Sequence, residues 1–461
     1  MANSVPPQNP HDPHDAGSPA GPNASRLAQS AKESGGAGAP RPPHRPWRTA
    51  VLGGMASYMD AATIVGTGTA LVLYKDRLGL TPWTIGALSS ILTLGMAVGA
   101  ILGGRLGDTL GRRRVFTYDL VVYIVGLALL VAAVNPWMLF TGVALAGLSM
   151  GADIPTSLAL VAEEAPADKR GRLVAFSQVL WSCGGFAAYL IAYLVSDAGS
   201  LGARIIYGHV AVVALVVLVL RSRLRESREW LDERERQRSA AAERVREDSW
   251  RTLLHRPLLV ALLGLGLFYA IGNLVANTFG QFQAYLFTEV AGSTVSTATL
   301  VGMCAYPLAF VAVWVFMRYV EGPGRKVLFT VGILLMACGI GANLVFSVST
   351  TTLILLKLCI TIGSGLAGEV IFKVWAQEFF PTLIRGTAQG IAIAFTRFAA
   401  AGFALVTPAI AAVSPAALMS VLLAAVLLSG LLAWLWIFPL QHARARTTLT
   451  PATIPYAETS R

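Results

Sequence analysis

Long apolar runs dominate the chain from about residue 47 to residue 438. The runs Ile205–Leu220, Leu258–Ile271 and Leu418–Pro439 contain no Asp, Glu, Lys or Arg. A membrane-spanning helix needs about 20 mostly apolar residues, so the pattern predicts about twelve such helices. The expected spans are 47–73, 82–104, 115–134, 137–161, 173–195, 203–220, 257–287, 296–318, 327–347, 352–378, 386–412 and 415–438.

The composition supports a membrane protein, because 55% of the 461 residues are hydrophobic and 13% are charged. A soluble protein has about 25% charged residues. A net charge of +11 would suit a nucleic-acid partner, but most of the 36 basic residues fall in one set of loops and tails. Basic residues accumulate on the cytoplasmic side of membrane proteins. The basic residues expected elsewhere are Lys75, Arg77, Arg204, Lys357, Lys373 and Arg397.

This distribution predicts a multi-pass membrane protein with both termini in the cytoplasm. The lipid bilayer surrounds such a protein, and no nucleic-acid partner is expected. The Ala- and Arg-rich composition favours the inner membrane of a bacterium. The spans divide the chain into two six-helix halves, a charged and partly helical linker, and two cytoplasmic tails, of which the first is expected to be disordered. The expected ranges are 1–46 for the first tail, 47–220 and 257–440 for the halves, 221–256 for the linker and 441–461 for the last tail.

One pair of loop motifs occurs in each half. The loop GRLGDTLGRRR (104–114) and the shorter EGPGRK (321–326) both have an acid, two spacers, a Gly and two basic residues. The segments EEAPADKRG (163–171) and EFFPTLIRG (378–386) both read E-x-x-P-x-x-x-R-G. Two matched motifs at similar spacing in both halves indicate a duplicated six-helix unit.

These loops carry a family resemblance. The GRLGDTLGRRR loop resembles the signature of major facilitator transporters, and the E-x-x-P-x-x-x-R-G motif is similar to that of their sugar-porter branch and its metabolite-transporting relatives. The resemblance covers about residues 47–440. It implies an all-α membrane protein of twelve transmembrane helices in two pseudo-symmetric six-helix halves, with a substrate site at the midplane between them.

The charged residues of the motifs form a candidate cytoplasmic gate. Exposed ion pairs contribute only about 0–1 kcal/mol each, so a network of them can break in every cycle. The resemblance implies that the network closes the cytoplasmic side, whereas the alternative is that these charges only fix the topology. The candidate residues are Asp108, Arg112, Glu163, Arg170, Glu321, Arg325, Glu378 and Arg385.

Two acids inside the spans are candidates for proton coupling. A charge at mid-bilayer costs about 2.5–3.5 kcal/mol on insertion scales. Each of these acids is therefore expected either to have a partner or to serve a function. Asp60 resembles the first-helix acid of proton-coupled sugar porters, although it could also be a buried acid bound to a Ser or Thr. Asp153 lies in a G-x-D-x-P arrangement similar to that of proton-coupled phosphate and aromatic-acid transporters, and it could instead contact a cationic substrate. Asp119 is grouped with the loops, near the end of the third span.

Three further charges are candidate substrate contacts. Glu369 and Lys373 are four residues apart, so they share one helix face and can neutralise each other. Lys373 stands where sugar porters commonly have a Trp, which argues against a sugar. Arg397 is alone in its span, and its guanidinium could bind a carboxylate or phosphate in bidentate fashion. The alternative for Arg397 is a permanent pairing with Asp60 or Asp153.

Uncharged polar residues complete the candidate substrate site. Gln178 matches a sugar-contacting Gln of the sugar porters. Asn273, Asn277 and Gln281 recur every four residues and form a polar stripe on an apolar helix. Aromatic residues that could flank a planar ligand, but that more often serve packing, are Trp181, Phe279, Phe282, Tyr285 and Trp375.

The function that these residues favour is proton-coupled symport of a small organic anion, such as an aromatic carboxylate, by alternating access. The alternatives are a sugar or polyol:proton symporter, a drug exporter, and a nutrient sensor that has a transporter fold but does not transport. No nucleophile–base set or metal-ligand spacing is evident, so neither an enzyme nor a cofactor is expected. The protein is expected to be a monomer. The four cysteines are expected to be small apolar core residues: Cys183, Cys304, Cys338 and Cys359.

Overall fold

The computed structural model describes residues 46–110, 112–164, 170–222, 253, 255–320, 324–380 and 382–442. Within these ranges the chain is helical. The expected tails, most of the expected linker and the loop residue Glu321 lie outside the described residues. The side chains of five expected gate residues are likewise outside this part: Asp108, Arg112, Glu163, Arg170 and Arg385.

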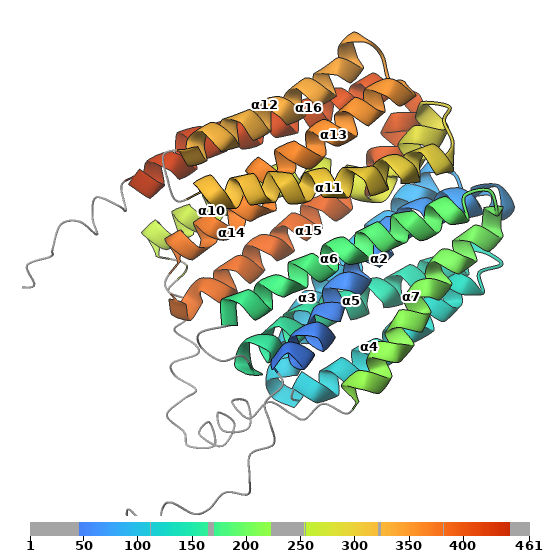
Figure 1. The fold of residues 1–461 in the computed structure, drawn as a ribbon, viewed down its shortest axis with the longest axis horizontal. Coiled ribbons are helices and arrows are strands. Elements are labelled where there is room, and N and C mark those ends of the chain that lie inside the picture. The colour runs from blue at the N-terminus through green and yellow to red at the C-terminus, as the bar shows by residue number, and fades with distance from the viewer. Residues whose placement is uncertain are drawn as a thin grey trace, which may run out of the picture. The chain divides into compact units, whose positions relative to one another are not determined.

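Six long helices form the N-terminal half (Figure 1). They follow one another along the chain and run back and forth across the bundle. Their bounds are α2 (Pro46–Leu78), α3 (Pro82–Leu110), α4 (Arg112–Val131), α5 (Pro136–Glu164), α6 (Arg170–Leu194) and α7 (Gly199–Arg221).

The C-terminal half repeats this arrangement with some helices broken or extended. A π-helical turn continues α10 and another continues α16, and a break divides α13 from α14. The bounds are α10 (Arg256–Tyr285), η1 (Leu286–Val290), α11 (Val295–Tyr319), α12 (Gly324–Val345), α13 (Thr350–Ala367), α14 (Glu369–Phe379), α15 (Thr382–Val413), α16 (Pro415–Leu432) and η2 (Ala433–Ile437).

The packing inside the two halves follows the same pattern. In the N-terminal half α3 packs on α5, α2 on α6 and α4 on α7; in the C-terminal half α11 packs on α13, α10 on α15 and α12 on α16. The contacts between the halves are related in the same way, because α3 meets α15, α6 meets α11, and α2 meets α10. This correspondence confirms the duplicated fold that the loop motifs predict.

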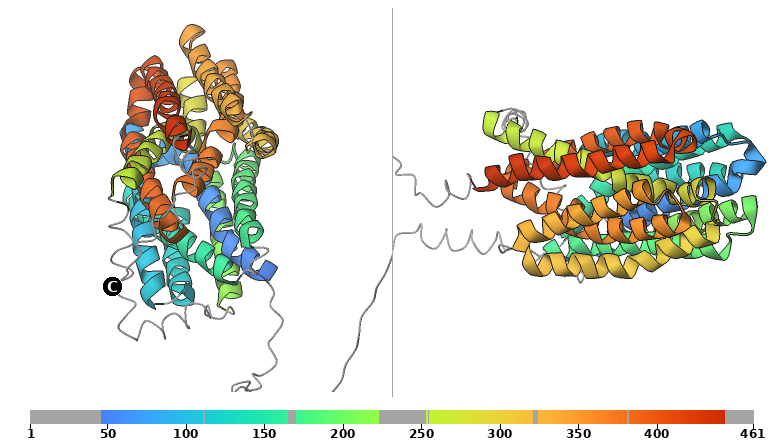
Figure 2. Two further views of the ribbon diagram at one scale, coloured as in Figure 1. Left: turned by 90° about the vertical axis from the view of Figure 1, so that its left-hand side faces the viewer. Right: turned by 90° about the horizontal axis from the view of Figure 1, so that it is seen from above.

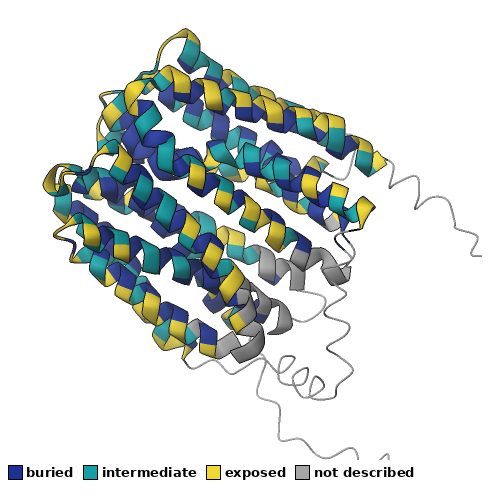
Figure 3. Cartoon of the chain, turned by 180° about the vertical axis from the view of Figure 1, so that it is seen from behind, coloured by how far each residue is buried: buried dark blue, intermediate teal, exposed yellow. Residues whose placement is uncertain are grey.

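The helices have the length and composition of membrane spans. Eight of the described helical segments are long and apolar enough to cross a membrane, and α2, α5 and α6 reach 33, 29 and 25 residues. Figure 3 shows exposed residues along the outer helix faces and buried residues where helices pack. Many of the exposed residues are large and apolar, such as Trp314 and Val212. A continuous apolar outer surface is expected where lipid surrounds the protein.

Both described ends of the bundle lie on one side, where α2 begins and the last helical residue, His442, is found (Figure 2). We call this the terminal side and the other the opposite side. On the opposite side, helices of the C-terminal half begin with side-chain caps. Thr294, Ser349 and Ser414 each accept a hydrogen bond from the backbone three residues later, which satisfies a donor that the first turn leaves unpaired. These caps fix the points at which α11, α13 and α16 start.

The structure corrects three expectations. The expected single span 352–378 is divided at Gly368, whose φ of −96° and ψ of −131° end α13 and start α14. Arg221 belongs to α7 and is buried, not part of a solvated linker. Of the cysteines only Cys359 is buried; Cys183, Cys304 and Cys338 are exposed, because their helices turn one face away from the core.

Near the opposite side, glycines bring the backbones of the two halves into close contact. A Cβ atom on Gly86 of α3 would lie 2.3 Å from the carbonyl oxygen of Leu405 in α15. A Cβ atom on Gly68 of α2 would lie 2.2 Å from the carbonyl oxygen of Gln281 in α10. The obstacles are backbone atoms, which have no rotamer to change. Any side chain at these two positions must therefore separate the helices.

Replacement of Gly86 by Val should open the opposite side. Overpacking costs about 1–3 kcal/mol, and this cost falls on the arrangement in which α3 touches α15. Spin labels at the exposed positions Asp76 and Thr351, in a background without native cysteines, should show a longer distance in a larger fraction of molecules. The control is Gly208→Val in α7, where no atom lies within 4 Å of the added Cβ. An unchanged distance distribution in Gly86→Val would contradict this interpretation of the contact.

Candidate functional site

Charged and polar side chains from five helices meet in the middle of the bundle. We call this group the central site. The N-terminal half contributes Asp60 from α2 and Gln178 and Trp181 from α6. The C-terminal half contributes Tyr269 from α10, Glu369 and Lys373 from α14, and Arg397 from α15.

Asp60 is almost fully buried, with 2% of its surface exposed. The indole Nε1 of Trp181 donates a hydrogen bond of 3.0 Å to its Oδ2, and its Oδ1 has no hydrogen-bond partner. The expected alternative, a hydrogen bond from a Ser or Thr, is therefore wrong. A carboxyl group with one unpartnered buried oxygen can hold a proton on that oxygen without breaking a bond.

Glu369 and Lys373 form the ion pair that their spacing predicts. The Nζ of Lys373 lies 2.8 Å from Oε1 of Glu369, and both side chains remain about half exposed, at 49% and 50%. The break at Gly368 places Glu369 in the first turn of α14, where the helix dipole favours a negative charge. The half-exposed pair therefore faces space that is wide enough to admit water.

A hydrogen bond joins this pair to the other half. Lys373 Nζ donates to Oε1 of Gln178, at 3.3 Å. The ring of Tyr269 stacks on Phe372 with a centroid distance of 4.1 Å, and Tyr269 interacts electrostatically with Glu369. Residues of both halves thus surround one accessible position.

Arg397 is partly buried beside this group. Among the described residues no carboxylate lies within 4 Å of its guanidinium, and the contact of its Nη1 is with Sδ of Met96, at 3.6 Å. Arg397 still interacts electrostatically with both Asp60 and Glu369. The central site therefore contains two acids and two bases, and its formal charge is zero when all four are ionised.

Asp153 is not part of the central site. Its Oδ1 lies 2.7 Å from Nη1 of Arg221 and accepts a hydrogen bond from Ser157 at 2.5 Å. The expectation that Arg397 could pair with Asp153 is therefore wrong. The sequence does not reveal the partner, because Arg221 stands at the start of a charge-rich run that suggests solvent. The signal that was available is its position directly after an apolar run.

The predicted polar stripe of α10 lies between the central site and the opposite side. Gln281 is buried; its Nε2 donates to Oδ1 of Asn277 at 2.9 Å and to Oγ1 of Thr93 in α3 at 3.0 Å. Asn273 is partly buried. The bond to Thr93 crosses from one half to the other, so the stripe contributes to the contact between the halves.

Further contacts between the halves lie on the opposite side. Lys75 at the end of α2 forms an ion pair with Glu289 in η1. The hydroxyl of Tyr189 in α6 donates to Oε1 of Gln283 at 3.0 Å, and Nζ of Lys357 lies 5.6 Å from the centroid of the same ring. These contacts hold the opposite side closed.

On the terminal side one pair of the expected gate is described. Nη1 of Arg325 lies 2.8 Å from Oε1 of Glu378, and Gln441 donates to the other oxygen at 2.9 Å. This pair joins two motif loops of the same half. The link between the halves that the resemblance implies involves residues outside the described part.

The aromatic residues divide into two groups. Phe279, Phe282, Tyr285 and Trp375 are buried in the core, and Trp375 is surrounded by other rings, such as Phe268 at 5.1 Å between centroids. Only Trp181 reaches the central site, through its bond to Asp60. Tyr269 also reaches the site, and sequence reasoning missed it because it is one of many aromatic residues in apolar helices.

Comparisons with known proteins agree with this architecture. The family model described as the Major Facilitator Superfamily matches residues 50–403. The chain is 32% identical over 368 residues to the minor myo-inositol transporter IolF of Bacillus subtilis (strain 168), a match that covers 79% of this chain and 84% of that protein. It is 28% identical over 371 residues to the glucose transporter GlcP of Staphylococcus epidermidis, with 74% and 81% covered.

Solved structures show the same fold. The crystal structure of a D-xylose-proton symporter matches with a TM-score of 0.71 at 22% sequence identity, covering 84% of this chain and 96% of that one. Family match, relatives and fold are all those of transporters and not of enzymes. The chain belongs to the Major Facilitator Superfamily and is a membrane transporter of its sugar-porter-like group.

Proposed function

We propose that this transporter carries a small neutral polyhydroxylated compound, of the polyol or monosaccharide class, together with a proton. The observation that carries the proposal is the accessible, charge-balanced group formed by Glu369, Lys373 and Gln178. A carboxylate accepts hydrogen bonds and an ammonium group donates them, so neighbouring hydroxyls of one ligand can bind both. The names of two relatives, which refer to myo-inositol and glucose, support the same class, whereas two other relatives are named as niacin transporters.

Charge balance favours a neutral ligand. A site whose acids and bases cancel attracts neither sign of charge strongly, and specificity then comes from the placement of donors and acceptors. Gln178 adds an amide that both donates and accepts. The bond from Lys373 to Gln178 joins the halves, so a ligand that replaces this bond would contact both halves at once.

Asp60 is the proposed proton carrier. When Asp60 is ionised, Arg397 is the base that balances it; when Asp60 takes up a proton, the central site becomes positive by one charge. The proton and the ligand are therefore bound by neighbouring groups that share one electrostatic field. This is the condition for coupling between two binding events.

Alternating access requires that the site open to one side at a time. With the opposite side closed by the contacts between the halves, the site would open toward the terminal side. The distribution of basic residues favours a cytoplasmic terminal side, so the proposed state faces inward and loads or releases ligand there. The monomer is the proposed transport unit, since each chain contains both halves of the site.

An organic anion, the ligand class favoured by the residue types alone, is the second candidate. It is supported by Arg397, a partly buried guanidinium with no carboxylate of the described residues within 4 Å. Protonation of Asp60 would leave this charge uncompensated and able to bind a carboxylate. The balance of charges and the polyol relative place this candidate second.

Glu369→Gln and Lys373→Gln should each weaken binding of a neutral polyol. A hydrogen bond to a charged group contributes about 1.5–3 kcal/mol, so the Kd should rise at least about tenfold. Calorimetric titration of purified protein with myo-inositol, D-glucose and D-xylose measures this change. The control is Lys326→Gln, a lysine that contacts His442 on the terminal side. Failure of all three compounds to bind the unmodified protein would count against the neutral class.

Asp60→Asn should separate exchange from accumulation. Asn resembles a protonated Asp in shape but exchanges no proton, so the variant should exchange labelled ligand across proteoliposomes while proton-driven accumulation falls to the passive level. Asp76→Asn, an exposed acid at the end of α2, is the control and should accumulate normally. Full accumulation by Asp60→Asn would remove Asp60 from the proposed mechanism.

Arg397→Gln distinguishes the two ligand classes. Loss of a buried charge that binds a carboxylate costs about 2–5 kcal/mol, so binding of an anion such as benzoate would be abolished. A polyol that is bound by Glu369 and Lys373 should keep its Kd within about threefold of the unmodified protein's value, which corresponds to ~0.6 kcal/mol of binding free energy. Binding of benzoate to the unmodified protein and its loss in Arg397→Gln would make the anion the ligand class.

A further inference from the structure

A second charged group lies inside the N-terminal half, away from the central site. It consists of Asp119 in α4, Asp153 in α5 and Arg221 at the end of α7. All three side chains are buried, with Asp119 8% exposed and Arg221 2% exposed. Since they belong to one half, no contact between the halves is needed to form the group.

Arg221 is held by several partners. Its Nη1 is bound to Asp153 at 2.7 Å, its Nη2 donates to Ser157 at 3.2 Å, and its Nε donates to the carbonyl oxygen of Leu52 at 2.9 Å. These bonds join α7 to α5 and α2. The positive charge of Arg221 is thus matched by the negative charge of Asp153.

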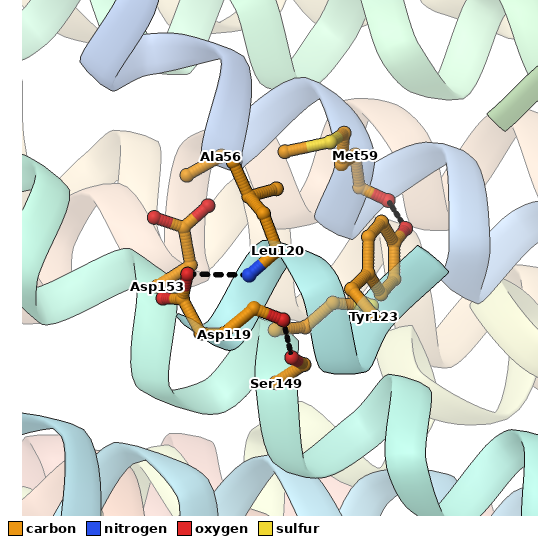
Figure 4. Close-up of a pocket in the computed structure, with 8 residues that line it drawn as sticks. Ala56, Met59, Asp119, Leu120, Tyr123, Ser149 and Asp153 are labelled. Atoms are coloured by element: carbon orange, nitrogen blue, oxygen red, sulfur yellow. Dashed lines mark hydrogen bonds between the residues drawn. The ribbon is translucent and has the colours of Figure 1, made fainter. Parts of the chain in front are cut away.

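The negative charge that Asp119 would carry when ionised therefore has no positive charge in this group to balance it. Its Oδ1 accepts a hydrogen bond of 2.6 Å from its neighbouring backbone N–H at Leu120, and its Oδ2 has no hydrogen-bond partner. Counted over the described side chains, two carboxylates and one guanidinium leave a net negative charge, which is unfavourable in a buried position. Figure 4 shows Asp119 and Asp153 as neighbours at the edge of one small pocket, with Oδ1 of Asp119 facing the backbone N–H of Leu120.

A small cavity borders both acids. It has a volume of about 10 Å³, which is the room that one water molecule requires. The other groups that face it carry no charge: Ala56 and Met59 from α2, Leu120 and Tyr123 from α4, and Ser149 and Met150 from α5. Among the described residues the charges that act on Asp119 are therefore those of Asp153 and Arg221.

We propose that Asp119 and Asp153 form a proton-binding site beside Arg221, in which Asp119 holds the proton at neutral pH. Two neighbouring carboxylates disfavour each other's ionised form, and one proton removes the excess charge. Asp119 is the proton holder because Asp153 is bound to Arg221, while Oδ2 of Asp119 is unpartnered. The proton on Oδ2 can be donated to a water molecule in the cavity, which Asp153 also borders.

A metal cation fits this position less well than a proton. Hard cations bind several oxygen ligands in a defined geometry, whereas the carboxylate of Asp153 is already bound to the positively charged Arg221. The cavity also leaves no room for further ligands. The site is separate from Asp60, although the hydroxyl of Tyr123, bonded to Thr63 at 2.5 Å, interacts electrostatically with both Asp60 and Asp153.

Infrared spectroscopy of the purified full-length protein tests the proposal, because a protonated carboxyl group has its own carbonyl stretching band. The measurement is made at neutral pH in an Asp60→Asn background, so that the result does not depend on the proposed proton carrier. Asp119→Asn should remove the band of one carboxylic acid per chain. Asp76→Asn, at an exposed acid, should remove none.

Asp153→Asn gives an independent result if Asp119→Asn does not fold. Without Asp153, Asp119 becomes the acid that balances Arg221, so it should ionise and the same band should disappear. Persistence of the band in whichever of these two variants folds would overturn the proposal. A band that appears only when Na⁺ and Li⁺ are replaced by choline would also overturn it, because it would assign the site to a cation.

Discussion

An ionised side chain in the bilayer core must find a partner inside the protein, because lipid offers none. On insertion scales an isolated charge there costs about 2.5–3.5 kcal/mol, and two ion pairs inside the described helices meet this requirement. Glu369 is paired with Lys373 within one helix, and Asp153 with Arg221 across two. The rest of the structure depends on this constraint, since the helices that carry paired charges must stay in register with each other.

The two pairs satisfy the constraint in different ways. The pair of Glu369 and Lys373 remains half exposed and needs only one helix, so α14 can move without breaking it. The pair of Asp153 and Arg221 is buried and joins α5 to α7, and hydrogen bonds to backbone carbonyls join it to α2. Removing one partner of such a buried pair typically costs about 3–5 kcal/mol. The first pair suits a site that exchanges ligands, and the second a rigid half that moves as one body.

The fold could be predicted from the sequence because its signals are local or repeated. Apolar runs predict the spans, and the duplicated motifs predict the two halves. The pair of Glu369 and Lys373 was predictable for the same reason, since four residues on a helix fix the distance between them. The partner of Asp153 was not, because Arg221 is 68 residues away and only the packing of both α5 and α7 against α2 and α4 brings them together.

The substrate class, like the partner of Asp153, depends on contacts between residues that are far apart in the sequence. Arg397 and Lys373, read as residue types, favour an anion, because isolated basic residues in a membrane suggest a negatively charged ligand. The structure places them with two acids, so the formal charge of the central site is zero. A sum of charges depends on which helices meet, and α2, α14 and α15 meet only in the folded protein. The balance of charges that supports the proposed neutral ligand therefore follows from the folded structure and not from the residue types alone.

The central site and the group around Asp119 are separate, and this affects how proton binding and ligand binding can be coupled. Groups at the interface between halves change their surroundings when the halves move, since Lys373 must lose its bond to Gln178 if α14 and α6 separate. The group around Asp119 lies within one half, so the same motion leaves its internal distances unchanged. A proton held there would respond to access of water and not to rearrangement of partners. Asp60, on a helix that contacts both α6 and α10, is the acid whose partners the motion of the halves can change.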